Sequence, residues 1–265
     1  MAAPAPYSAA VEAEPIVGFH PVREALRARR RRLRRLVLRS GLRRPELGEL
    51  RALARAAGVP VDEVSADALA RLAPGARTQG LLLEAGALPA LELDALLELG
   101  PPGRRCVVAI DGVEDPQNVG ALFRAADAAG ATGALVTERH APPLGAAVSR
   151  ASAGALEHLP VARVVNLARA LVRARERGFW VLALDPQGGD DLFGAPAQVF
   201  RGDLVLVVGG EERGVRHGIR RLADHCLTIP MRGHVASLNV AAAGALALFE
   251  VARRREPPGD SSPGS

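Results

Sequence analysis

The chain has 265 residues, of which 48% are hydrophobic and 24% are charged, and its formal net charge is +5. This composition suffices for a buried core, and the length accommodates two modest globular domains. No apolar run approaches the roughly 18 residues that a membrane-spanning helix needs, and residues 1–14 lack the pattern of a signal peptide. We therefore expect a cytoplasmic protein, neither secreted nor embedded in a membrane.

The first part of the chain predicts a small α/β domain. A Pro- and Ala-rich segment at 1–15 is expected to be disordered. Helices are expected at 22–26, 45–57 and 66–72, and strands at 36–38 and 59–64. Residues 87–104 contain several prolines and glycines and predict a linker. We place an N-terminal domain at 16–86 and a domain boundary near residue 100.

A dense run of arginines lies within this N-terminal domain, and every basic residue of the chain is an arginine. Guanidinium groups pair with phosphate in bidentate fashion and stack on bases, so such a run suits RNA. A solvated helix end is the alternative interpretation. The candidate RNA-binding residues are Arg29, Arg30, Arg31, Arg32, Arg34 and Arg35.

The second domain, at 105–256, alternates regularly between strands and helices. Strands are expected at 106–110, 134–137, 159–164, 180–184, 204–208 and 226–229, and helices at 118–129, 145–152, 167–177 and 238–254. Such alternation is typical of an α/β fold with a mainly parallel sheet covered on both faces, whose ligands bind beyond the carboxyl ends of the strands. The Pro-, Gly- and Ser-rich segment at 257–265 is expected to be disordered.

The first segment of chemical interest, Asp111 to Arg124, directly follows a predicted strand. Asp115 can cap the next helix, and Pro116 can occupy its first turn because that position needs no amide donor. These two residues are explained by structure alone. Asn118 and Arg124 lie near enough to the strand end to reach a pocket at the edge of the sheet.

The second segment, Gly209-Gly210-Glu211, also follows a predicted strand. Glycine has no Cβ, so backbone amides at such a turn can approach a ligand closely. The chain has no G-x-x-x-x-G-K-[ST] motif and no G-x-G-x-x-G after the first strand of this domain, which removes the usual support for nucleoside triphosphate or NAD binding. An ordinary turn with a solvated Glu211 is the alternative interpretation.

The third segment, Ser237 to Val240, opens the last predicted helix and follows Ile229-Pro230-Met231. The hydroxyl of Ser237 suits a helix cap, which explains that residue without chemistry. Asn239 gains little inside the first turn of an apolar helix unless its amide bonds to a group outside it. Three separate strand-to-loop junctions thus predict one composite pocket.

Metal and hydrolase chemistry find no support in the sequence. Cys106 and Cys226 lie in apolar strand-like runs, and we interpret both as reduced core residues. Neither they nor the six histidines have the spacing of metal ligands, so no metal site is expected. The G-x-S-x-G signature of serine hydrolases is also missing from the sequence.

Taken in order, the three segments resemble the three motifs of the SpoU/TrmH family of RNA ribose 2'-O-methyltransferases. The resemblance extends over nearly the whole chain apart from its two ends. The segment Val17-Gly18-Phe19-His20-Pro21 further resembles the opening of the RlmB-like branch, whose members methylate a guanosine ribose in 23S ribosomal RNA.

The resemblance implies an enzyme of the SPOUT class that uses S-adenosylmethionine and no metal. It implies a trefoil knot in the C-terminal domain, a homodimer, and a ribosomal-protein-L30e-like RNA-binding domain at the N-terminus. The expected substrate is a guanosine in 23S ribosomal RNA. Transfer RNA is the alternative substrate, and a non-catalytic RNA-binding assembly factor of the same fold is the alternative function.

The resemblance also assigns the site residue by residue. Cofactor binding, largely through backbone groups, falls to Gly209, Gly210, Ile229, Met231 and Leu238. Catalytic roles fall to Asn118, Arg124, Glu211, Ser237 and Asn239. In the family, the arginine at the position of Arg124 is proposed to promote loss of the ribose hydroxyl proton. Because guanidinium stays protonated in proteins, stabilising the developing alkoxide or positioning a phosphate suits it better.

Two positions depart from the family pattern. Ala241 occupies a position where a serine is usual, and Thr78 stands where a histidine often precedes the pair Gln79-Gly80. We expect the first departure to leave the chemistry intact. The second concerns the RNA contact of the N-terminal domain.

Overall fold

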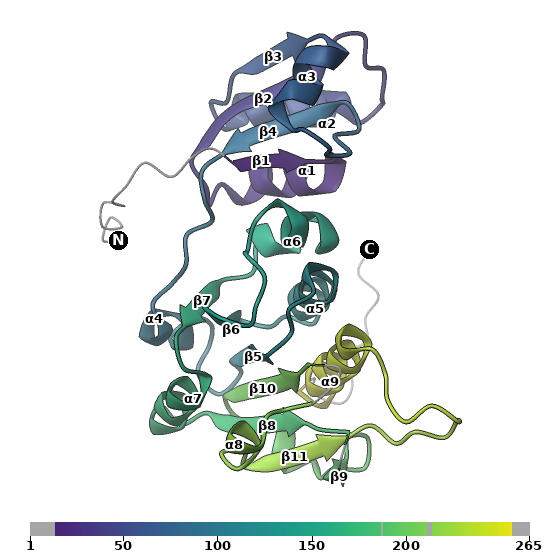
Figure 1. Ribbon diagram of the computed structural model, residues 1–265. Coiled ribbons are helices and arrows are strands. Elements are labelled where there is room, and N and C mark those ends of the chain that lie inside the picture. Colours follow the sequence, from purple (N-terminus) through teal and green to yellow (C-terminus); the bar gives the residue numbers. More distant parts are fainter. Residues whose placement is uncertain (1–13, 187, 211–213, 256–265) are drawn as a thin grey trace, which may run out of the picture. The chain divides into compact units, whose positions relative to one another are not determined.

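The computed structural model describes residues 14–186, 188–210 and 214–255 and divides the chain into two compact units, Met1–Pro89 and Ala90–Ser265 (Figure 1). The division falls earlier than the boundary that we placed near residue 100. In the part of the chain that the structure describes, no helix has both the length and the apolar character needed to cross a membrane.

The N-terminal unit is a four-stranded sheet covered by helices on both faces. In spatial order its strands are β1 (Glu14–Val17), β4 (Leu81–Ala85), β2 (Leu33–Arg39) and β3 (Val61–Val64), and its helices are α1 (Phe19–Ala28), α2 (Leu47–Ala56) and α3 (Ala66–Leu72). Strand β4 pairs antiparallel with both β1 and β2, whereas β2 and β3 are parallel. Residues 14 and 15 therefore belong to β1, although we expected disorder there.

Successive residues of β4 enter different cores because neighbouring side chains on a strand point to opposite faces. Leu81 and Leu83 pack in the core that α1 and α2 cover, and Leu82 packs in the core that α3 covers. A strand that is buried on both faces reads as a continuous apolar run without alternation. Sequence analysis accordingly predicted no strand here.

The second unit is built on a seven-stranded sheet. In spatial order its strands are β7 (Val161–Val164), β6 (Gly133–Thr137), β5 (Cys106–Asp111), β10 (Leu204–Gly209), β8 (Trp180–Leu184), β11 (His225–Thr228) and β9 (Asp190–Asp191). Every neighbouring pair of these strands is parallel. The predicted mainly parallel α/β fold is thus confirmed, and β5, β6, β8, β10 and β11 lie within one residue of their predicted bounds.

Helices cover both faces of this sheet, with α5 and α9 on one side and α4 and α7 on the other (Figure 1). The helices of the unit are α4 (Leu93–Leu97), α5 (Pro116–Ala128), α6 (Ala146–Ala151), α7 (Leu167–Glu176), α8 (His217–Arg220) and α9 (Val240–Arg255), with 3-10 turns at Ala155–Glu157 and Ala197–Phe200. Helix α9 packs closely on α5, because a Cβ at Gly244 would lie 2.4 Å from Leu122 Cδ1.

Helix α4 lies within the segment 87–104 that we predicted to be a linker. Its Leu96 and Leu97 are buried in the core of the second unit. Leu96 rests directly on the backbone of β6, since a Cβ at Gly133 would lie 2.5 Å from its Cδ1. The prolines and glycines of the segment flank a short apolar stretch. Burial of that stretch stabilises a helix of one to two turns. Residues 90–104 therefore belong to the second unit and include a helix.

At the amino end of the sheet, the last described residue of α9 is anchored to several loops. The guanidinium of Arg255 donates hydrogen bonds to the carbonyl oxygens of Phe200, Gly202 and Arg105 at 2.6–3.2 Å. Cys106, the first residue of β5, is buried beside it, and this burial raises the pKa of its thiol to about 11. The prediction that Cys106 is a buried core residue is confirmed.

Candidate functional site

The three segments of chemical interest meet at the carboxyl edge of the parallel sheet. Strand β5 ends at Asp111, β10 ends at Gly209, and β11 ends at Thr228 shortly before the third segment. Carboxyl ends of parallel strands lie at one edge, where α/β proteins bind their ligands. Two adjoining clefts open there.

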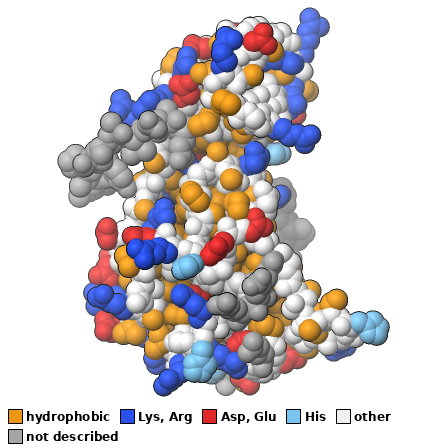
Figure 2. All heavy atoms as spheres, in the orientation of Figure 1, with side chains coloured by type: hydrophobic (Ala, Val, Ile, Leu, Met, Phe, Trp, Pro, Cys, Tyr) orange, Lys and Arg blue, Asp and Glu red, His pale blue; other side chains and the backbone are white. Residues whose placement is uncertain are grey.

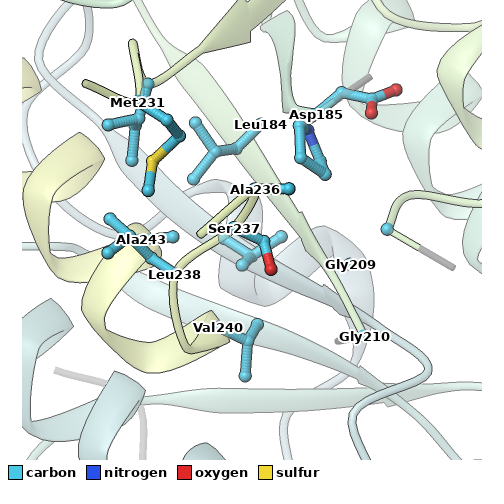
Figure 3. A pocket seen from close by; sticks show the side chains of 14 residues that line it. Leu184, Asp185, Gly209, Gly210, Met231, Ala236, Ser237, Leu238, Val240 and Ala243 are labelled. Carbon is cyan, nitrogen blue, oxygen red and sulfur yellow. The ribbon is translucent and has the colours of Figure 1, made fainter. Parts of the chain in front are cut away.

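The first, which we call the apolar cleft, is walled by aliphatic side chains, glycines and one acid (Figure 3). Its lining residues are Leu184, Asp185, Pro186, Val208, Gly209, Gly210, Gly214, Ile229, Met231, Ala236, Ser237, Leu238, Val240 and Ala243. They enclose about 590 Å³, counting the part that is open to solvent. All five residues predicted to bind the cofactor lie in this lining.

One wall of the apolar cleft consists of backbone only, because neither of its glycines could carry a side chain. A Cβ at Gly209 would lie 2.1 Å from the carbonyl carbon of Gly214, and one at Gly210 would lie 2.6 Å from the carbonyl oxygen of Gly112. The turn is closed by a hydrogen bond from the Gly214 amide to the Gly210 oxygen, at 2.8 Å. Glycine is required at both positions because another part of the backbone lies this close, and the predicted approach of their amides to a ligand stays a prediction.

Asp185 is the acid of the apolar cleft, and sequence analysis did not identify it. Its side chain is 3% exposed and pairs with Nε of Arg220 at 3.1 Å. Asp185 directly follows β8, so it lies beyond the carboxyl end of a strand, where ligands of parallel α/β sheets bind.

The second, which we call the polar cleft, is lined by charged and amide side chains. Its lining residues are Asp111, Gly112, Val113, Glu114, Asp115, Asn118, His140, Gly210, Gly214 and Arg216. Gly210 and Gly214 line both clefts, so the clefts adjoin along one turn of the backbone.

An ion pair between the buried Asp111 and the half-exposed Arg216 ties this shared turn to the end of β5. The side chain of Asp111 is fully buried, and one of its oxygens accepts from Nε of Arg216 at 2.7 Å. Its other oxygen accepts from the backbone amide of Arg216 at 2.9 Å. A buried carboxylate is costly unless such donors satisfy it. Arg216, which sequence analysis overlooked, therefore holds the loop that follows Gly214.

At the mouth of the polar cleft, Nδ1 of His140 lies 3.1 Å from a carboxylate oxygen of Glu114. Both side chains are largely exposed, at 68% and 69%. Sequence analysis assigned neither residue to the site, because 26 positions separate them.

Asn239 connects the start of α9 to α5. Its Oδ1 accepts from the amides of Ala241 and Ala242 at 3.0 and 3.3 Å, which makes Asn239 the N-cap of the helix. Its Nδ2 donates to Oδ1 of Asn118 at 2.9 Å. The helix begins at Val240, so Ser237 is not its cap, contrary to our expectation. The Asn239 amide thus bonds to a group outside its own helix, Asn118, as we expected.

The remaining predicted catalytic residues are distributed as follows. Ser237 is exposed and lines the apolar cleft. Arg124 is exposed on α5, lines neither cleft, and has no hydrogen bond or ion pair to any residue that the structure describes. Six positions along a helix amount to about one and two-thirds turns, so Arg124 and Asn118 face different directions. Glu211 lies outside the described residues.

The predicted run of RNA-binding arginines divides into engaged and exposed members. Arg31 is 5% exposed and donates to the carbonyl oxygen of Gly86 at 3.3 Å. Arg35 binds both carboxylate oxygens of Glu84, at 2.9 and 2.7 Å. Arg30 is half-buried, whereas the exposed members are Arg29, Arg32 and Arg34. Intramolecular bonds therefore take up part of the run that we assigned to RNA.

Over the described ranges, no three His, Cys, Asp or Glu side chains cluster in a way that would hold a metal ion. The linings of the two clefts offer shape, hydrogen bonds and fixed charge. An apolar cleft with a backbone wall suits a small organic cofactor, and an adjoining polar cleft suits a hydrogen-bonding substrate.

Comparisons with known proteins agree with this geometry. Residues 105–249 match the model of the SpoU rRNA Methylase family, and residues 15–90 match that of RNA 2'-O ribose methyltransferase substrate binding. The chain is 36% identical to the 23S rRNA (guanosine-2'-O-)-methyltransferase RlmB of Ralstonia nicotianae, over 91% of this chain and 95% of that protein.

Solved structures give the same result. The AdoMet-bound rRNA methyltransferase of Sinorhizobium meliloti matches with a TM-score of 0.75 at 25% identity, covering 93% of this chain and 89% of that chain. The SpoU methyltransferase AviRb of Streptomyces viridochromogenes, in complex with AdoMet, matches with a TM-score of 0.75 at 27% identity, covering 92% and 91%. The matched segments include all three motifs, and the chain belongs to the SpoU family of RNA methyltransferases.

Proposed function

We propose that this protein transfers a methyl group from S-adenosylmethionine (AdoMet) to the 2'-hydroxyl of a guanosine ribose in 23S ribosomal RNA. The observation that carries the proposal is the junction of the apolar and polar clefts at Gly210 and Gly214. A cofactor in the first cleft and a ribose in the second would face each other across this turn. The relative named a 23S rRNA guanosine methyltransferase supports the choice of substrate.

The residues of the apolar cleft fit AdoMet. Gly209 and Gly210 carry no side chain, and a Cβ at either would clash with the backbone of Gly214 or Gly112, so only main-chain atoms of these two residues face a ligand in the cleft. Leu184, Met231 and Leu238 would contact the apolar parts of the cofactor (Figure 3). AdoMet, when bound, supplies an electrophilic methyl group on a sulfonium.

The protein would contribute mainly alignment and electrostatic stabilisation. The hydrogen bond between Asn239 and Asn118 fixes two amide side chains beside the shared turn, where they can orient the ribose. Arg124 would stabilise the alkoxide that develops on the ribose or hold a neighbouring phosphate. Ser237 would bind at the edge of the cofactor cleft, and Glu211 would anchor its own loop.

We further propose that the protein is a cytoplasmic homodimer with a trefoil knot in its C-terminal domain. Leu246 and Phe249 support the dimer, because they leave 43% and 51% of their surfaces exposed on α9. The N-terminal unit is proposed to be ribosomal-protein-L30e-like and to bind the RNA substrate. Its mixed sheet with helices on both faces is compatible with that assignment.

The test is transfer of labelled methyl from AdoMet to an unmodified 23S rRNA transcript and to unmodified tRNA, followed by digestion to nucleosides. We expect label in 2'-O-methylguanosine from the ribosomal transcript. Label from tRNA alone would overturn the substrate but keep the reaction. Intact AdoMet binding with no label in either RNA, or in assembling ribosomal particles, would favour a non-catalytic RNA-binding protein.

A further inference from the structure

A second group of arginines lies at one end of β2, and the run from Arg29 to Arg35 lies at the other end. We call this second group the arginine rim, and its members are Arg39, Arg43, Arg44 and Arg77. Arg39 ends β2, Arg43 and Arg44 follow in the loop before α2, and Arg77 lies in the loop before β4. A strand rises about 3.3 Å per residue, so Arg39 is roughly 23 Å from Arg32. The two groups are separate surfaces.

The two loops of the rim are fastened to each other. The amide of Arg39 donates to the carbonyl oxygen of Gly80 at 2.8 Å. Gly80 has a φ of +85°, and a Cβ there would lie 3.0 Å from Cδ1 of Leu42, so the Leu42 side chain covers this turn. Oγ1 of Thr78 accepts from the Gly80 amide at 3.3 Å. The rim is therefore one ordered surface built from two segments far apart in sequence.

The rim carries positive charge that the unit itself does not neutralise. All four side chains are exposed, and none has a hydrogen bond or ion pair to the described residues. Glu46 is the acid nearest in sequence to Arg44, and no ion pair joins them within those residues. Elsewhere on the same unit the basic side chains visible in Figure 2 are interspersed with acids, and arginines pair across elements, as in Arg27 with Glu49 and Arg51 with Glu63.

We propose that the arginine rim is the surface through which the N-terminal unit contacts the phosphates of the RNA substrate. The inference rests on the proposed function and specifies how the substrate is held. Exposed guanidinium groups without internal partners can bind phosphate without breaking an intramolecular ion pair. Their binding also releases counterions from the RNA. The rim has no aromatic side chain, so backbone contact is favoured over base stacking.

Polar groups at the crest of the rim add a further contact. Gln79 is exposed and has a φ of +53°, which places it at the tip of the turn between Arg77 and β4. Its amide can both donate to and accept from a ribose or base edge. This position adjoins Thr78, where the chain departs from the family pattern, so the rim is also the place where this chain's RNA contact would differ from that of its relatives.

The experiment compares two double variants of the full-length protein. One is Arg43→Gln with Arg44→Gln in the rim, and the other is Arg32→Gln with Arg34→Gln at the far end of β2. Each removes two exposed positive charges from the same unit, so the net charge of both variants is equal. Affinity for a 23S rRNA transcript is measured over a series of salt concentrations, together with AdoMet affinity and methyl-transfer kinetics.

We expect the rim variant to bind RNA about tenfold more weakly at low salt, with the slope of log affinity against log salt reduced by about 2. Its KM for RNA should rise while kcat and AdoMet affinity stay unchanged. Arg32 and Arg34 are exposed members of the run that the sequence assigned to RNA, so the comparison sets the two candidate surfaces against each other. We expect the Arg32 and Arg34 variant to retain more of the wild-type affinity and slope than the rim variant. Equal losses in both variants would indicate a general effect of charge and overturn the proposal, as would a rim variant that behaves like the wild type.

The two proposals fail in different ways. If the wild-type protein binds the transcript but transfers no methyl group, the proposed function fails, and the salt dependence of the variants still tests the rim. If the wild type is active and the rim variant is equally active with unchanged KM, only the rim is excluded. Thermal unfolding of both variants shows whether either substitution disturbs the fold.

Discussion

The two clefts of the catalytic unit share a wall but are built in opposite ways. The apolar cleft depends on shape, because aliphatic side chains and bare backbone line it, whereas the polar cleft depends on the ion pair of a buried carboxylate and on amide hydrogen bonds. Gly210 and Gly214 belong to both. In the proposed function, one turn of backbone separates a cleft that would select its ligand by fit from a cleft that would select by charge.

The difference predicts distinct consequences for substitutions on the two sides. A change in the apolar cleft should act through steric strain and reduce cofactor binding. A change in the polar cleft or at its border should leave cofactor binding intact and reduce the rate of methyl transfer. Three substitutions separate these effects, from the largest to the smallest.

Gly209→Ala should have the largest effect. Its Cβ would lie 2.1 Å from the backbone of Gly214, and backbone cannot yield as a flexible side chain would. Displacement of the Gly214 turn, which lines both clefts, should lower AdoMet affinity by roughly 150-fold, equivalent to about 3 kcal/mol and measurable by calorimetry. Gly218→Ala is the matched control, since a Cβ there would meet nothing within 4 Å. Normal AdoMet binding by Gly209→Ala would show that the backbone wall is dispensable.

Arg124→Ala should reduce methyl transfer by about 100-fold, the typical cost of removing one donor that stabilises a developing oxyanion. AdoMet affinity should not change, because Arg124 does not line the apolar cleft. Single-turnover rates and calorimetry measure the two quantities separately. Asp127→Ala, at another exposed position of α5, controls for disturbance of the helix. An unchanged rate in Arg124→Ala would remove this residue from the mechanism.

The two functions of Asn239 can be separated by comparing Asn239→Ser with Asn239→Ala. Serine retains an oxygen that can cap α9 but loses the bond to Asn118, whereas alanine loses both. Both variants should lose about fivefold in rate, equivalent to roughly 1 kcal/mol. Only the alanine variant should also lose about 1 kcal/mol of unfolding free energy. Equal stability of the two variants in urea would contradict the capping role.

Much of the second unit could be predicted from its sequence because parallel strands buried on both faces give continuous apolar runs. Strand β8, for example, lies at its predicted bounds. Strand β4 is harder to predict by this rule, because Glu84 interrupts its apolar run after only three leucines. Helix α4 was missed because the prolines and glycines around it outweighed five helical residues, although its two buried leucines secure it.

The candidate site was predictable in its membership but not in its geometry. Motif order identified Asn118 and Asn239, yet only the fold shows that their amides meet across 121 positions. Helix capping was predicted at Ser237 and occurs at Asn239, because the helix begins two residues later than expected. Arg216 carries no motif, and only its position directly after β8 marks Asp185 in the sequence. Their importance follows from burial and pairing, which depend on long-range contacts that no local pattern encodes.

Because Arg255 is anchored beside the buried Cys106, the rate at which this thiol is alkylated can report detachment of the end of α9. At about pH 8, a thiol with a pKa of about 11 is ionised in about one molecule in a thousand, so Cys106 should resist alkylation while the fold is closed. The half-buried Cys226 at the other side of the sheet provides an internal reference. The ratio of label at the two thiols, followed over time by mass spectrometry, would therefore measure how often the end of α9 detaches from the sheet.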